Sequence, residues 1–287
     1  MVKLRNILKW SFIGLILLFI YFPIIFLTIN SFNESDIIQA GWGGFSLAHY
    51  EYFFNLDNEP FRVVLQTILL AIAVAFLSTV LGTIGAIGIF YSKKRVNKTL
   101  SAINRIPVIN AEVVTAISFA LLVSIFAIDK STYIPLILGQ MILCTPFVLL
   151  SIIPKIRQMD NNLYEAALDL GATPTKALFS VIIPQILPGI ISGFMLAITL
   201  SLDDYVITAY TKPDSFKTIS THIYGLDKNN VVGPKIKAAY WAFTAIIFFL
   251  IVAVVITANI LSYRKTRSKK KWKLKKETFT THIWIVA

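Results

Sequence analysis

The sequence predicts an all-α membrane protein with six transmembrane helices. Of its 287 residues, 56% are hydrophobic and 15% are charged, whereas soluble domains have roughly 45–50% and 25%. The hydrophobic residues form long blocks, each with the ~20 residues that a helix needs to cross a bilayer. This pattern excludes a soluble fold. The blocks cover approximately Ile7–Ile29, Val63–Tyr91, Pro107–Ile128, Tyr133–Ile153, Pro188–Tyr210 and Ala238–Tyr263.

The six blocks make up one predicted transmembrane domain over residues 1–263, and a basic tail follows over residues 264–287. The first block comes after Lys3 and Arg5, as the hydrophobic core of a signal peptide also would. It is longer than such a core, and no small-residue cleavage site follows it. We therefore interpret it as a retained span.

The distribution of basic residues predicts the orientation of these spans. Twenty of the 27 Lys and Arg residues lie at the two termini and in the second and fourth connections, all on one side of the membrane. The positive-inside rule makes this side cytoplasmic, so both termini are expected there, in a bacterial plasma membrane. The net charge of +12 thus belongs to the connections, and a nucleic-acid partner is not expected.

The sequence offers few residues for metal or redox chemistry. Its one cysteine, Cys144, lies inside a hydrophobic block, so a disulfide framework is excluded. His49, His222 and His282 are far apart and lack the paired spacing of metal ligands. We expect no metal or other cofactor in this chain.

The connection between the fourth and fifth blocks predicts two short helices joined by a sharp bend. Residues 163–170 have room for two helical turns, and Gly171 can adopt the left-handed conformation that ends a helix. Thr173 and Pro174 then suit the N-cap and first position of a second helix. Such a pair is a candidate docking element for a partner, and the alternative is an amphipathic connector on the membrane surface.

This connection resembles the EAA motif of the membrane subunits of ATP-driven importers. The motif residues are Glu165, Ala166, Ala167, Gly171, Val181, Ile183 and Pro184. The resemblance implies the permease fold of type I ABC importers, with cytoplasmic coupling helices over about residues 160–184. It also implies that ATP and Mg²⁺ are bound by a partner ATPase and that this chain is a transport subunit without enzymatic activity. The coupling residues would be Glu165, Ala166, Ala167, Leu170, Gly171, Phe179 and Pro184.

A second resemblance extends over most of the chain. Residues 112–118, 199–204 and 222–224 are similar to the second permease type of spermidine/putrescine importers. This resemblance implies polyamine import. It also implies four kinds of partner: a second homologous permease in a heterodimer, two ATP-binding subunits, an extracellular polyamine-binding protein and the polyamine itself.

Acidic residues inside the predicted spans independently favour a cationic substrate. A charge inside a span is costly unless it is paired or faces water, so Asp203, Asp204 and Glu112 are candidates for the substrate path. We expect the Asp pair in the outer half of the fifth span and Glu112 near the inner end of the third, at two depths of one path. The alternatives are that the pair only ends the fifth helix, paired with Lys212 or Lys217, and that Glu112 pairs with Arg105.

Aromatic and small residues on the last spans also have two interpretations. Tyr205 and Trp241 lie near the predicted outer ends, where aromatic residues form interfacial belts, although either could hold an ammonium group by a cation–π contact. Residues at every fourth position of the fifth span allow close helix packing, within the bundle or against a sister permease. These small residues are Gly189, Gly193, Ala197 and Ser201.

Other functions stay open at this stage. The chain could instead serve an importer for an amino acid, an iron complex or sulfate, although acidic residues in the path disfavour an anion. A six-span cation channel or an ion-coupled transporter is a further alternative. Such a protein would not need a cytoplasmic docking pair.

Overall fold

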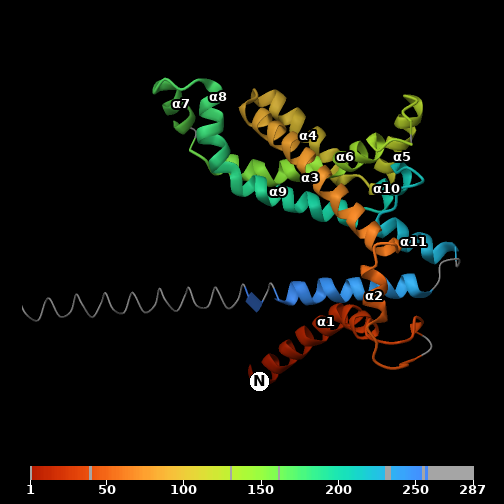
Figure 1. Ribbon diagram of the computed structural model, residues 1–287. Helices are drawn as coiled ribbons and strands as arrows, with labels where there is room; N and C mark the ends of the chain where they lie inside the picture. The colour runs from red at the N-terminus through yellow and green to blue at the C-terminus, as the bar shows by residue number, and fades with distance from the viewer. Residues whose placement is uncertain are drawn as a thin grey trace, which may run out of the picture. The chain divides into compact units, whose positions relative to one another are not determined.

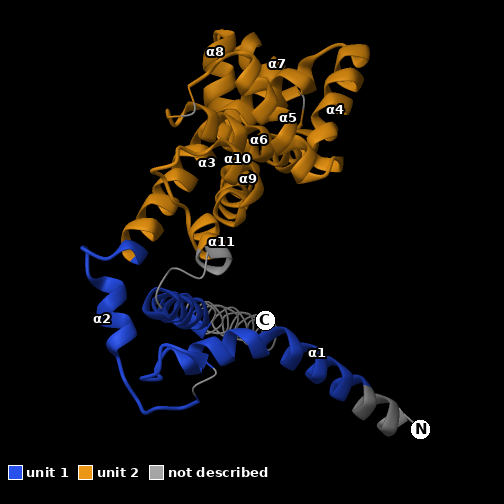
Figure 2. Ribbon diagram, turned by 90° about the vertical axis from the view of Figure 1, so that its right-hand side faces the viewer, with its two compact units in different colours: residues 1–60, 232–287 blue, residues 61–231 orange. Residues whose placement is uncertain are grey.

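The computed structural model describes residues 2–38, 41–129, 131–160, 162–229, 234–253 and 256–257. These residues are almost all helical, with one isolated β-bridge between Asn33 and Phe45. The chain divides into two compact units, residues 1–60 with 232–287 and residues 61–231 (Figure 2). The predicted basic tail lies outside the described residues.

Two long hydrophobic helices and one short helix form the first unit. They are α1 (Val2–Asn30), α2 (Ala48–Phe54) and the helix over Pro234–Ala253. Aromatic rings connect α2 to the last of these helices, because Phe53 stacks on Phe243 with ring centroids 5.5 Å apart. His49 meets Trp241 edge-on at 5.9 Å.

The second unit contains most of α3 and all remaining described helices (Figure 1). These helices are α3 (Glu59–Tyr91), α4 (Lys94–Ile109), α5 (Glu112–Ile125), α6 (Ile134–Gln158), α7 (Asn162–Asp169), α8 (Pro174–Ala177), α9 (Ile183–Asp203), α10 (Val206–Thr211) and α11 (Ile219–Asn229). A π-helical segment, Leu178–Ile182, joins α8 to α9. The prediction of an all-helical membrane protein is confirmed.

The number of membrane-crossing helices agrees with the six hydrophobic blocks. Among the described residues, five helices are long and hydrophobic enough to cross a membrane, and α4 together with α5 would make a sixth. These two helices are bent by 106° relative to one another. The prediction of one continuous helix over Pro107–Ile128 is therefore wrong, because α4 ends at Ile109 and α5 begins at Glu112.

The fifth predicted span also has different ends. Its helix runs from Pro174 through Asp203, 30 residues, which is about 45 Å at 1.5 Å per residue. Pro184 cannot donate the backbone hydrogen bond of a regular helix, and the π-helical segment ends two residues before it, at Ile182. Pro188 lies inside α9 and does not begin it. The helix ends at Asp203, earlier than the predicted end at Tyr210.

Small residues bring α6 into close contact with its neighbours at the centre of the second unit. A Cβ atom on Gly82 of α3 would lie 2.7 Å from Val148 Cγ1, and one on Gly193 of α9 would lie 3.0 Å from the same atom. Further along the same face of α9, the Cys144 thiol contacts the Ala197 carbonyl oxygen at 3.6 Å. The small residues of α9 therefore pack inside this chain. Packing within the bundle was one of the two interpretations of their spacing.

Candidate functional site

The docking segment has the predicted helix, bend and helix. Gly171 ends α7 with φ +84°, and no atom lies within 4 Å of the position that a Cβ would take there. The Ala172 N–H donates to the Ala167 carbonyl and the Gly171 N–H to the Leu168 carbonyl, which is the Schellman arrangement of helix ends. Thr173 caps the next helix, because its hydroxyl accepts from the Lys176 N–H at 3.4 Å.

The docking segment exposes most of the side chains expected to contact a partner. Leu170 is 89% exposed and Phe179 is 62% exposed. Glu165 and Ala166 are exposed and Ala167 is half-buried on α7, while Pro184 is exposed at the start of α9. This segment presents an apolar surface together with two exposed acidic residues of α7, Glu165 and Asp169.

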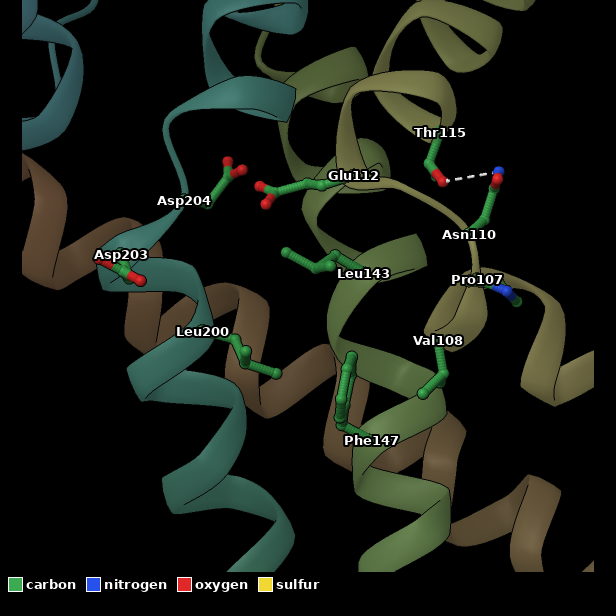
Figure 3. Close-up of a pocket in the computed structure, with 10 residues that line it drawn as sticks. All are labelled: Pro107, Val108, Asn110, Glu112, Thr115, Leu143, Phe147, Leu200, Asp203 and Asp204. Carbon is green, nitrogen blue, oxygen red and sulfur yellow. Dashed lines mark hydrogen bonds between the residues drawn. The ribbon is translucent and has the colours of Figure 1, made fainter.

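A cavity of about 250 Å³ lies within the second unit, where α4, α5, α6 and α9 come together (Figure 3). It is smaller than the 300–1,000 Å³ of drug-sized ligand sites, which suits a slender solute. The bend between α4 and α5 and the end of α9 both lie at this cavity. Its lining residues are Pro107, Val108, Asn110, Glu112, Thr115, Leu143, Phe147, Leu200, Asp203 and Asp204.

The three predicted acidic residues line this one cavity. Figure 3 shows the carboxylate groups of Glu112 and Asp204 pointing toward one another. The expectation of two depths is therefore wrong. It assumed a third helix that continues from Pro107, whereas the sharp bend after Ile109 brings Glu112, in the first turn of α5, to the end of α9.

The three carboxylates differ in exposure and in hydrogen bonding. Glu112 and Asp203 are exposed, whereas Asp204 is 3% exposed. Asp204 Oδ1 accepts from the Ile207 N–H at 3.1 Å, and Oδ2 accepts from the Thr208 N–H at 2.9 Å. Asp204 thus ends α9 and caps the start of α10. The end of a helix was one of the two interpretations given for the Asp pair.

The charge of the cavity has one sign. Among its described lining residues there are three carboxylates and no Lys, Arg or His. The basic residues of the alternative interpretations lie elsewhere: the ammonium group of Lys212 donates to the Pro213 carbonyl at 3.4 Å, and Arg105 forms no ion pair with Glu112 within the described structure. A cleft lined by one sign of charge concentrates ions of the opposite sign, so this cavity favours cations.

The two predicted aromatic residues lie in different units. Tyr205 follows Asp204 in the second unit, and its ring centroid is 4.6 Å from that of Tyr224; Tyr205 is not among the lining residues of the cavity. Trp241 belongs to the first unit, where it packs against His49.

Two buried polar residues at this site are not among the residues that the sequence predicts. Gln140 and Thr208 are fully buried and hydrogen-bond to the Asp204 carboxylate. Gln140 lies inside a hydrophobic block. Polar side chains inside spans tend to be functional, so this position could have identified Gln140 as a candidate. Thr208 carries no such signal, because threonine is common in membrane helices.

Comparisons with known proteins find one family and several relatives that match most of this chain. Residues 78–267 match the family described as "Binding-protein-dependent transport system inner membrane component". The spermidine/putrescine transport system permease protein PotC of Haemophilus influenzae is 30% identical over 258 residues, covering 90% of this chain and 97% of that protein. The putrescine transport system permease protein PotI of Escherichia coli is 30% identical over 271 residues, covering 91% and 92%.

A solved structure shares the fold. It belongs to a bacterial ABC transporter involved in the import of the acidic polysaccharide alginate. The two chains have a TM-score of 0.62 and 21% identity, and the match covers 91% of this chain and 96% of the other. At this identity the likeness concerns the fold alone.

Proposed function

This chain belongs to the family of inner membrane components of binding-protein-dependent transport systems, and on that premise we propose that it is the permease subunit through which an ATP-driven importer takes up spermidine and putrescine. The relatives named as polyamine permeases support this substrate class. The observation that carries the proposal is the cavity with three carboxylates and no basic residue among its described lining.

The cavity offers complementary chemistry to a polyamine. The exposed carboxylates of Asp203 and Glu112 would accept charge-assisted hydrogen bonds from ammonium groups, which are roughly twice as strong as neutral ones. Leu143, Phe147 and Leu200 provide apolar walls for the methylene groups between these charges. A sulfate ion would meet only like charge here, which argues against the anion alternative.

The docking segment supports the proposed partners. In this proposal α7, the Gly171 bend and α8 fit an ATP-binding subunit, which binds ATP and Mg²⁺. The complex contains two such subunits, a second homologous permease and an extracellular polyamine-binding protein. It lies in a bacterial plasma membrane with both chain termini in the cytoplasm.

One helix connects the docking segment to the acidic cavity. Figure 1 shows α8 at one end of α9 and α10 at the other, and this helix is continuous from Pro174 to Asp203. Movement of the docking segment would therefore act directly on the residues that hold the substrate. We propose this helix as the mechanical link between ATP hydrolysis and the opening and closing of the cavity.

A substrate panel tests the proposed function. The chain and its partner subunits are expressed in a bacterial host that lacks polyamine uptake, and uptake of labelled spermidine, putrescine, sulfate and a neutral amino acid is measured. We expect uptake of one or both polyamines, with the other solutes at the level of the untransformed host. Uptake of sulfate or the amino acid without polyamine uptake would overturn the proposal.

A further inference from the structure

The side chain of Gln140 connects three helices directly behind the acidic cavity. Gln140 is 0% exposed in the second turn of α6. Its amide nitrogen donates to Asp204 Oδ2 at 3.2 Å and to Thr208 Oγ1 at 2.8 Å. Its amide oxygen accepts from the Ser201 hydroxyl at 2.6 Å. One side chain of α6 thus bonds to the last turn of α9, to the break after it and to α10.

This amide contacts the one cavity carboxylate that is almost inaccessible. Asp204 Oδ2 accepts from the Gln140 amide, from the Thr208 N–H and from the Thr208 hydroxyl. A buried carboxylate needs such donors, because burying a polar group without hydrogen bonds costs free energy. The donors occupy Oδ2, so Asp204 has little room to bind a substrate ammonium with this oxygen.

The other contacts between α6 and α9 near this point do not involve the Asp204 carboxylate. Cys144 packs against Ala197 one turn along α6, and Val148 packs against Gly193 one turn further. Such contacts hold the helices together without fixing the direction of a carboxylate. The hydrogen bonds of Gln140 are directional, and they reach α9 where its helix ends.

We propose that Gln140 is a positioning residue for the acidic site, acting through Asp204. It fixes the break between α9 and α10 and holds the Asp204 carboxylate at the cavity, opposite Glu112. The placement of this carboxylate, and with it the affinity of the cavity for a cation, depends on this buried amide. The inference deepens the proposed function and rests on it for the identity of the transported cation.

Two variants remove different parts of this network. Gln140→Leu has a similar volume and removes all three hydrogen bonds, and Thr208→Val removes the hydroxyl that bonds to both Gln140 and Asp204. We expect each to raise the KM for spermidine about tenfold, as for the loss of a hydrogen bond to a charged group, with a smaller change in maximal rate. Cys144→Ala, one turn away on the same face of α6, is the matched control and should leave KM unchanged.

A double-variant comparison separates positioning from packing. If Gln140 acts through Asp204, Gln140→Leu adds little to the KM of Asp204→Asn, since both changes disturb the same group. In the Asp203→Asn background Gln140→Leu should keep its full effect. Equal multiplication of KM in both backgrounds would mean that Gln140 only fills space between helices, and the inference would be wrong.

A labelling experiment tests the inference without any transported solute. Cys144 is the one cysteine in the sequence, so Thr115→Cys in a Cys144→Ala chain places a single thiol in the cavity wall. We expect the assembled transporter to react faster with a cationic thiol reagent than with an anionic one. Gln140→Leu should reduce this preference severalfold.

The labelling result distinguishes the two proposals. A transporter that prefers the cationic reagent but imports no polyamine would contradict the proposed substrate, and the effect of Gln140→Leu on labelling would still decide the role of Gln140. An unchanged preference in Gln140→Leu would overturn the inference. The absence of any cationic preference in the parent would overturn it as well, because there would be no negative charge in the cavity for Gln140 to position.

Discussion

The acidic residues of the cavity divide into two kinds by exposure. Asp203 and Glu112 are exposed and available to a solute, whereas Asp204 is buried and already accepts several hydrogen bonds. Neighbouring residues in the sequence therefore have different tasks. Asp203 would contact the substrate, and Asp204 would supply fixed negative charge and end the helix.

Asp203→Asn tests the contact with the substrate. Loss of a charge-assisted bond worth roughly 1.5–3 kcal/mol predicts at least a tenfold rise in the KM for polyamine uptake. Spermidine should suffer more than putrescine, because its additional ammonium group needs another partner along the path. Initial uptake rates at varied concentration, at equal amounts of membrane-inserted protein, measure the effect.

Asp214→Asn is the control for this prediction. Asp214 is an exposed acid in the turn after α10 and does not line the cavity, so its removal changes the net charge equally without changing the site. Equal loss of uptake in the two variants would show that general surface charge, and not the Asp203 contact, sets the rate.

At the residue scale the sequence points to the three acids that line the cavity, because each lies inside a hydrophobic block. Their meeting in one cavity could not be predicted, since it depends on the sharp bend between α4 and α5. The buried amide of Gln140 stayed unnoticed because its partners lie at least 61 residues away in the sequence.

At the scale of helices, the Gly171 bend is the part best predicted from local sequence. The order of Gly171, Thr173 and Pro174 determines the end of one helix and the start of the next through short-range hydrogen bonds alone. The helix break at Asp204 depends on local and tertiary contacts together. The Asp204 carboxylate accepts from the nearby N–H groups of Ile207 and Thr208, which competes with a continuous helix, and it also accepts from the distant Gln140 amide.

Gly171→Val tests the docking segment. A β-branched residue is strained at φ +84°, so the second docking helix should be misdirected and uptake should be lost while the chain still inserts. Gly171→Asn is the matched control, because asparagine tolerates positive φ. It should retain most activity. Normal uptake and normal ATPase assembly in Gly171→Val would contradict the docking role.

Gly82→Ala tests the close packing of α3 on α6. The added methyl group would lie 2.7 Å from Val148 Cγ1, and such overpacking typically costs about 1–3 kcal/mol. The thermal midpoint of the detergent-solubilised complex should therefore fall. Gly88→Ala in the same helix adds a methyl group where no atom lies within 4 Å, and it should leave the midpoint unchanged. Equal midpoints would refute this packing.

At the scale of the whole molecule, the chain combines a docking segment and a cation cavity at the two ends of one helix. Family membership makes it a transport component, and the cavity suggests which solute it carries. Neither end of this helix indicates the function alone, because a channel would need no docking segment and an anion importer would need no acidic cavity. The hydrophobic pattern predicted the membrane fold, but the arrangement of both ends along one continuous helix required the structure.

The most direct test of the account is ATP-dependent accumulation of spermidine in proteoliposomes that contain the complete importer and its binding protein. The parent complex is compared with one that carries Asp203→Asn together with Glu112→Gln. We expect accumulation by the parent that requires ATP hydrolysis, and a loss of at least tenfold in the double variant with the same protein incorporation. Accumulation at the parent rate by the double variant would contradict the central claim that the exposed carboxylates of this cavity receive the polyamine.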